Sequence, residues 1–292
     1  MKLQRTATFL GLACSTVLAV STAAQAASFT NNVSQTSDPE ADIWLNSITQ
    51  NGVTFNDFNL VKQATILKND SIKLTGNAGE TSNPELGGYV NNTGAASTER
   101  GDKATAPGGR EVSGLNNPTG DDIAAYLGNT NLNNIIDVED GGTTKMNLFF
   151  EKTIVADNTG LDNLFFWERG EGQWNASDML IQAIDASGNL IGNALTLLGA
   201  EKQYAGFSID TLEIGSAQKV GTWGVKLSQL GVTSAAGIRI FADWNYRGPD
   251  FKVMARSSAP ESVPEPATLA GLGLVAASLA AVRRRKVSKL SQ

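Results

Sequence analysis

Few residues in this chain can carry out acid–base or nucleophilic chemistry. Its 292 residues include no His and a single Cys, Cys14. The usual base of a catalytic triad and the commonest protein metal ligand are therefore absent. No spacing between a Ser and a Lys singles out an alternative pair. The composition thus disfavours acyl transfer and leaves carboxylates as the groups that could catalyse a reaction.

Glycoside hydrolysis is the reaction that carboxylates alone could support, because it needs two carboxyl groups facing each other across a cleft. The candidates flank aromatic segments and are Glu151, Glu168, Glu171 and Asp178. Charged residues at such positions are usually solvated strand ends. We therefore expect no enzymatic activity, and a glycoside hydrolase is the third functional hypothesis after two non-catalytic ones.

Calcium is the metal that this composition permits, since carboxylate and carbonyl oxygens are its preferred ligands. The densest acidic group lies at 137–142 and contains Asp137, Glu139 and Asp140. A calcium loop that started at Asp137 would have Gly141 at its fifth position, where a ligand is required. We expect no cofactor, and keep these three carboxylates as candidate ligands of a calcium site assembled by the fold.

Aromatic residues in loops could stack on sugar rings. Trp174 lies in a Gly-rich loop, and Tyr246 and Arg247 stand beside a Gly-Pro turn. A large aromatic side chain in such a loop is hard to explain by core packing. These three residues are the candidate carbohydrate contacts, whereas Trp223 and Trp244 follow an alternating pattern and are expected in the core.

The elements that must position these residues are mostly short strands. Segments rich in β-branched or aromatic residues, separated by turn residues, occur at 43–45, 53–55, 71–74, 146–155, 164–168, 179–184, 204–214, 223–227, 238–244 and 251–255. Several alternate between apolar and polar residues, which predicts half-buried antiparallel strands. The segment 164–167 is apolar throughout and predicts a central strand. Hairpin turns are expected at 185–189 and 199–200.

This pattern predicts an all-β domain over residues 27–258, an antiparallel two-sheet sandwich of jelly-roll-like form, with an irregular β-barrel as the alternative. The expected core aromatics are Phe149, Phe166, Phe207, Trp223 and Phe241. A Gly/Asn-rich excursion at 76–142 has too few apolar residues to form a core by itself. Within it, Thr119, Asp121 and Asp122 before an apolar run that ends at Gly128 predict one short helix.

The first 26 residues have the order of a secretory signal peptide. Lys2 and Arg5 precede an apolar run at 7–20, and small residues end at Ala24 and Ala26. Cleavage by signal peptidase after Ala26 would start the mature chain at Ala27. Cys14 would be removed with the signal peptide.

The segment 259–292 has a second recognisable order: a Pro-Glu-Pro tripeptide, an apolar stretch and a basic end. The tripeptide segment is Val263, Pro264, Glu265 and Pro266, the apolar stretch is 268–282, and the basic tail at 283–289 includes Arg283, Arg284, Arg285 and Lys286. At about 1.5 Å per residue the stretch spans about 22 Å of a hydrocarbon core of about 30 Å. It is therefore suited to a short, transient membrane helix held by its basic tail.

These residues resemble the PEP-CTERM sorting signal of exported bacterial proteins. The resemblance implies recognition at 263–266 by an exosortase, a membrane processing enzyme, followed by transfer to the cell surface or extracellular matrix, as in biofilms. The runs 164–170 and 180–185 also resemble ectodomains of some exosortase-dependent surface proteins.

The charge balance limits the partners of the exported part. The chain has 23 Lys and Arg against 29 Asp and Glu, and many of the basic residues lie in its two end segments. The part between them is therefore distinctly acidic and repels nucleic acid. We expect a non-catalytic structural or adhesive surface protein. The alternative is a module that binds extracellular polysaccharide.

Overall fold

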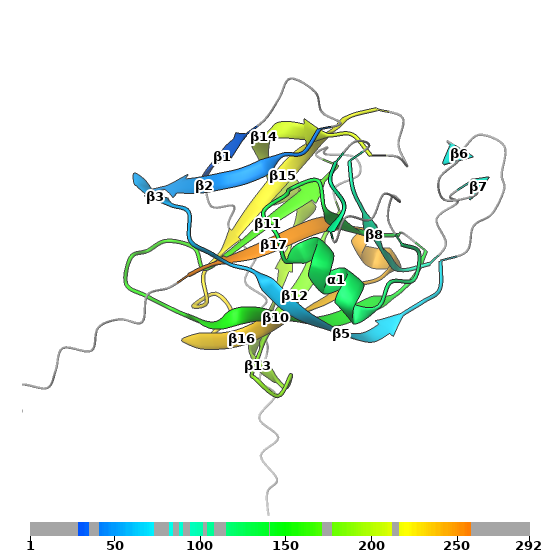
Figure 1. The fold of residues 1–292 in the computed structure, drawn as a ribbon. Helices are drawn as coiled ribbons and strands as arrows, with labels where there is room; N and C mark the ends of the chain where they lie inside the picture. The colour runs from blue at the N-terminus through cyan, green and yellow to red at the C-terminus, as the bar shows by residue number, and fades with distance from the viewer. Residues whose placement is uncertain are drawn as a thin grey trace, which may run out of the picture.

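Antiparallel strands form most of the computed structural model of the chain (Figure 1). The structure describes residues 29–34, 41–72, 82–83, 88–89, 94–101, 104–107, 115–139, 141–170, 177–211 and 216–257. Its elements are β1 (Thr30–Ser34), β2 (Trp44–Gln50), β3 (Val53–Phe55), β4 (Phe58–Asn59), β5 (Val61–Asn69), β6 (Ser82–Asn83), β7 (Gly88–Tyr89), β8 (Ala96–Glu99), α1 (Gly120–Leu127), β9 (Ile135–Val138), β10 (Thr144–Val155), β11 (Leu164–Arg169), β12 (Met179–Ile184), β13 (Leu190–Leu197), the 3₁₀ turn η2 (Gly199–Glu201), β14 (Gln203–Ile209), β15 (Gln218–Val225), β16 (Ser234–Ala242), the 3₁₀ turn η3 (Trp244–Tyr246) and β17 (Asp250–Arg256).

Two of the described sheets face each other and form a sandwich. One is five-stranded, in the order β13-β12-β16-β10-β5, and the other follows the order β14-β15-β11-β17-β9-β8, with β4 paired to β17. From β10 to β17 the chain alternates between the two sheets, one or two strands at a time. The predicted jelly-roll-like sandwich is thereby confirmed.

The five-stranded sheet buries one face and leaves the other open to solvent. In β16, Ile238, Ile240 and Ala242 belong to the main core between the sheets, whereas Arg239 and Phe241 are half-buried on the opposite face. This is the alternation that the sequence predicts for a half-buried antiparallel strand. The same sheet therefore supplies both core and surface.

The central strands of the larger sheet are buried on both faces, whereas Tyr204 on its edge strand β14 is exposed. In its central strand β11, Leu164 and Phe166 join the main core, while Phe165 and Trp167 join a second apolar cluster on the other side. A strand covered on both sides needs apolar residues at every position, which is what the segment 164–167 provides. The prediction of a central strand is confirmed.

A third layer covers the outer face of the larger sheet. It is the three-stranded sheet β1-β2-β3, seen at the upper left of Figure 1. The second cluster includes Leu45 and Ile48 of β2 and also Ile43, which lies just before that strand. Asn31 of β1 accepts a hydrogen bond of 3.0 Å from the Trp167 indole and donates one of 3.1 Å to the Ala205 carbonyl. Polar contacts thus fix this layer over an apolar interface.

The excursion's strands β8 and β9 and its helix α1 belong to the sandwich, whereas β6 and β7 form a separate two-stranded sheet. β8 and β9 extend the larger sheet, and Ile123, Tyr126 and Leu127 of α1 are part of the main core. The predicted helix is confirmed: Thr119 and Asp122 form a capping box, and the Gly128 amide bonds the Ala124 carbonyl at 2.7 Å. The excursion therefore takes its core from the strands around it.

Two local predictions are wrong. Ser71 and Ile72 lie outside any strand, because the pairing with β10 already ends at Asn69; the remaining residues of 71–74 are outside the described part. Gly199 and Ala200 do not form a hairpin turn. They belong to η2, which carries the chain from β13 in one sheet to β14 in the other.

The core prediction fails for three aromatic residues. Trp244 is 72% exposed, because the Asp243 side chain accepts a hydrogen bond of 2.9 Å from the Asn245 amide and starts a 3₁₀ turn. The strand alternation therefore stops before Trp244. Phe149 and Phe241 are half-buried on the open face, whereas Phe166, Phe207 and Trp223 are buried as predicted.

Candidate functional site

Two rows of side chains cross the open face of the five-stranded sheet, from β13 to β5. Strand register places the members of each row side by side. The first row is Thr196, Leu180, Phe241, Lys145 and Lys68, and the second is Ala194, Gln182, Arg239, Asn147 and Thr65. Alternate residues on one sheet face form a continuous surface. This face therefore brings together apolar, amide and cationic groups.

A groove of about 280 Å³ lies on this face. Its lining is Lys145, Leu180, Ile181, Gln182, Leu190, Arg239 and Phe241. Two of these side chains are cationic and none is acidic. A concave surface with apolar walls and a few convergent polar groups is the usual form of a small-ligand or polymer site.

Neutral groups orient the cations of the groove. Arg239 donates from Nε to the Asn147 side-chain oxygen at 2.8 Å and from Nη2 to the Gly188 carbonyl at 3.0 Å. The Lys145 ammonium lies 5.5 Å from the centre of the Phe241 ring. Within the part of the chain that the structure describes, neither cation forms a salt bridge. Both charges therefore remain available to an anionic group.

The turn η3 adjoins the groove. The Tyr246 ring meets the Phe241 ring edge-on at 5.7 Å, and the Asp178 amide donates to the Tyr246 carbonyl at 2.9 Å. Burial and the Asp243 and Asp178 carboxylates raise the pKa of Tyr246. The exposed Trp244 belongs to the same turn. Tyr246 thus extends the aromatic surface that Phe241 begins.

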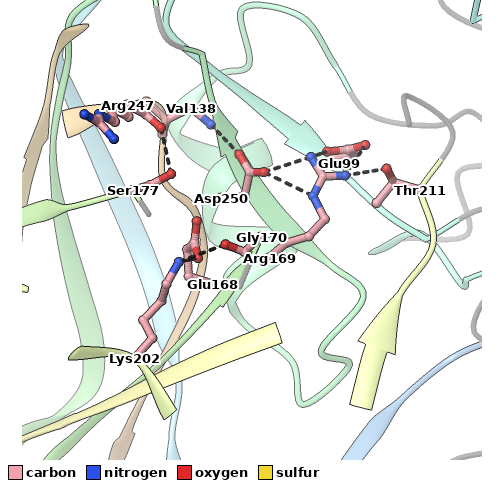
Figure 2. A network of polar contacts seen from close by, with 10 residues as sticks. All are labelled: Glu99, Val138, Glu168, Arg169, Gly170, Ser177, Lys202, Thr211, Arg247 and Asp250. Atoms are coloured by element: carbon pink, nitrogen blue, oxygen red, sulfur yellow. Dashed lines mark hydrogen bonds and ion pairs between the residues drawn. The ribbon is translucent and has the colours of Figure 1, made fainter. Parts of the chain in front are cut away.

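The other predicted carbohydrate contacts are placed differently. Arg247 is exposed and adopts the left-handed backbone conformation at φ 55°, and its carbonyl accepts a 2.7 Å hydrogen bond from the Ser177 hydroxyl (Figure 2). Trp174 lies outside the described residues. The sequence reasoning missed Lys145, Arg239 and Phe241. Their only sequence signal is alternation, which cannot reveal that distant strands pair.

A buried ionic network lies at one end of β11 (Figure 2). Arg169 donates to Asp250 from Nε at 3.1 Å and from Nη2 at 2.8 Å, pairs with Glu99 at 3.0 Å and bonds the Thr211 hydroxyl. The guanidinium side chain is 2% exposed. Its partners are two carboxylates and one hydroxyl from three other segments, so the network ties those segments together.

Glu168 forms a second buried pair in the same view. Its carboxylate contacts the Lys202 ammonium, which also donates to the Gly170 carbonyl at 3.2 Å (Figure 2). Burial raises the pKa of Glu168 to about 8, and the charge of Asp250 adds to the rise while Lys202 opposes it. Lys202 also lies 5.4 Å from the centre of the Trp223 ring. The pair is enclosed by protein.

The predicted catalytic carboxylates do not meet at one open cleft. Glu168 is 1% exposed, and Glu151 is exposed on β10 of the other sheet. Asp178 accepts a 2.7 Å hydrogen bond from the Gly199 amide, and Glu171 is outside the described part. Glycoside hydrolysis requires two carboxyl groups on either side of one bond. The three described groups lack this arrangement.

Two of the three predicted calcium ligands are buried in or beside β9. Asp137 lies within β9 and Glu139 directly follows it, and both are buried. Asp140 lies outside the described residues. Within the described ranges, no group of three or more His, Cys, Asp or Glu side chains comes together. The calcium site stays a prediction.

Within the described residues, fold and surface together define a layered β-protein in which one face of the five-stranded sheet is open. A family model described as the PEP-CTERM protein-sorting motif matches residues 262–286, so the chain carries this sorting signal, as its resemblance predicted. The motif supports an exported protein targeted to an exosortase, and it implies processing by such an enzyme after membrane anchoring. No curated protein and no solved structure matches the chain.

The targeting segments lie outside the described residues, so their predicted site residues stay predictions. This applies to the signal peptide at 1–26, the motif at 263–266, the apolar helix at 268–282 and the basic tail at 283–289. Among the residues that the structure does describe, no helix is long and apolar enough to cross a membrane.

Proposed function

We propose that this protein is a non-catalytic structural or adhesive component of the cell surface or extracellular matrix. One observation carries the proposal: Glu168, the candidate catalytic carboxylate beside the aromatic strand β11, is enclosed with Lys202. A carboxyl group enclosed in this way cannot reach a glycosidic bond of a polymer, as hydrolysis would require. The sorting motif supplies the route to the surface.

Analysis of the mature protein from hosts with and without an exosortase-type enzyme tests this proposal. We expect intact mass to show a product that begins at Ala27 and ends near Pro264 to Pro266, and that reaches the surface or matrix only when the enzyme is present. The same product should leave a panel of polysaccharides undegraded. A product that retains 283–292 in both hosts, or that degrades one of the polymers, would contradict the proposal.

Polysaccharide binding is the second candidate function, and the groove on the five-stranded sheet favours it. Phe241 in the groove lining and the exposed Trp244 in the adjoining turn η3 offer ring faces to sugar C–H groups. Gln182 offers its amide, of which Nε2 also donates to the Gly192 carbonyl at 3.0 Å. Such binding would be saturable and would depend on particular side chains. We expect Trp244→Ala to weaken retention on matrix polymer, and likewise Trp174→Ala, which changes the aromatic residue that the sequence predicts as a contact. If neither substitution affects retention, this candidate function is excluded.

A further inference from the structure

The groove has the opposite charge to the protein around it. The chain carries a formal net charge of −6, but the groove lining contains Lys145 and Arg239 and no acidic side chain. Lys68 adds a third cation in the same row as Lys145, and Asp70 pairs with it at 3.6 Å. A cationic site on an otherwise acidic protein attracts anionic groups locally, against the repulsion of the surrounding surface.

The two groove cations are arranged to contact one bound chain. Lys145 lies opposite Phe241, two residues along β16 from Arg239. Diagonal neighbours of this kind on an antiparallel pair are roughly 7–8 Å apart. Arg239 uses Nε and Nη2 for its neutral partners, and Nη1 has no partner among the described residues. A planar guanidinium held in this way can donate to a carboxylate.

We propose that this groove binds an acidic polysaccharide whose sugar units carry carboxylates. Arg239 and Lys145 contact the carboxylates, Phe241 and Leu180 contact the apolar faces of the rings, and Gln182 bonds hydroxyl groups. This inference rests on the polysaccharide-binding function proposed above and names its ligand class. It assigns specificity to charge, which the aromatic surface alone does not provide.

The test uses the full chain in a mild detergent and oligomers of polygalacturonic acid as the probe. The matched ligand is the same oligomer with its carboxylates methyl-esterified, which keeps the rings and removes the charge. We expect saturable binding of the acid form, weaker binding of the ester, and a loss of affinity at high ionic strength because salt screens exposed charges. Calorimetry gives the Kd of each form.

Three variants locate the binding to the groove. Arg239→Gln should weaken binding of the acid form roughly tenfold, as expected for one charge-assisted hydrogen bond. Lys145→Gln should weaken it less, and Arg239→Lys should retain part of the affinity. Lys219→Gln is the matched control, since Lys219 also lies over an aromatic ring, Tyr204 at 5.2 Å, but on the other sheet. Denaturation midpoints establish that each variant is folded.

The outcomes separate this inference from the function on which it rests. Equal binding of the acid and ester forms would overturn the charge-based specificity and keep a polysaccharide-binding protein. If Lys219→Gln reduces binding of the acid form as much as Arg239→Gln does, the assignment of the binding to the groove is overturned. Failure to bind either form would overturn the inference together with the second candidate function, leaving the structural role.

Discussion

The outer faces of the two sandwich sheets differ, because one is covered by a further layer and the other is open to solvent. On the larger sheet, Phe165, Trp167 and Met254 project outward and are completely or almost completely buried beneath β1-β2-β3. On the five-stranded sheet, Arg239 and Phe241 project outward and stay half-exposed. An added layer converts one outer face into a second core, whereas the other keeps its side chains available for contact. The covered face serves stability, and the open face is where we propose that recognition occurs.

The covered face is also richer in buried polar contacts. The Lys252 side chain lies on this face and is completely buried. It donates hydrogen bonds to the Tyr126 carbonyl at 2.5 Å and to the Asn129 side-chain oxygen at 3.0 Å. Burial holds the pKa of Lys252 well below its usual range. An amino group is costly to bury, so these two oxygen partners, from α1 and the segment directly after it, offset part of that cost. No comparable group is buried on the described part of the open face.

The largest expected effect compares outward-facing aromatics on the two sheets. Phe165→Ala should lower the free energy of unfolding by about 3–5 kcal/mol, as a fully buried Phe does, and Phe166→Ala in the main core should match it. Phe241→Ala on the open face should cost no more than about 1 kcal/mol. Urea denaturation measures all three. If Phe165→Ala costs as little as Phe241→Ala, the third layer is not a stable part of the fold.

The next prediction concerns pH and the enclosed Glu168. Its pKa in the folded protein is about 8 against an ordinary value of 4.5, so the stability it contributes is present below 4.5 and is lost as the pH rises toward 8. Between these two values Glu168 is ionised in the unfolded chain and protonated in the folded protein. Each pH unit in this range therefore lowers its contribution to the free energy of unfolding by about 1.4 kcal/mol. Glu168→Gln should remove this contribution, so that stability falls less with rising pH than in the unmodified protein across a series of denaturation midpoints.

The exposed Glu151 provides the control on the other sheet. Glu151→Gln makes the same chemical change at an exposed position of β10, so it controls for the loss of one acidic side chain without a change in the enclosed pair. Parallel curves for the unmodified protein and Glu168→Gln would show that Glu168 is not enclosed.

A smaller effect is expected at the start of α1, which joins the excursion to the main core. Thr119→Ala removes the capping box and should destabilise the protein by about 1 kcal/mol. Asp121→Ala removes an exposed acid from the same helical turn and should cost only a few tenths of a kcal/mol. Circular dichroism during denaturation compares them. A loss of helix signal before the sheet unfolds would mean that α1 does not share the stability of the sandwich.

The smallest effect on stability is expected for Trp244→Ala. Because this side chain is 72% exposed, the free energy of unfolding should change by no more than about 0.5 kcal/mol. Retention on polysaccharide should nevertheless fall if the open face binds sugar rings. A stability loss close to that of Phe165→Ala would mean that Trp244 packs against the protein, which would return it to the core where the sequence pattern placed it.

Sequence reasoning succeeded where the determining interactions are local. The capping residues around Thr119 and the apolar run at 164–167 are continuous in sequence, and both predictions are confirmed. It failed at Trp244, where one Asp243 side chain ends the strand and breaks the alternation. It also missed β5, a strand whose exposed and half-buried residues follow no clean alternation. Pattern analysis cannot weigh one hydrogen bond against a periodicity.

The sequence by itself determined the sorting signal, the strand-rich composition and the scarcity of catalytic groups, because each is a property of residue types or of contiguous segments. Only the tertiary structure decided which sheet face is covered and which is open. The groove depends on β10, β12 and β16 pairing in one register, which brings Lys145, Gln182 and Arg239 together across almost a hundred residues. The burial of Glu168 likewise depends on Lys202 arriving from a different strand connection. Such contacts arise from packing and have no signature in the linear order.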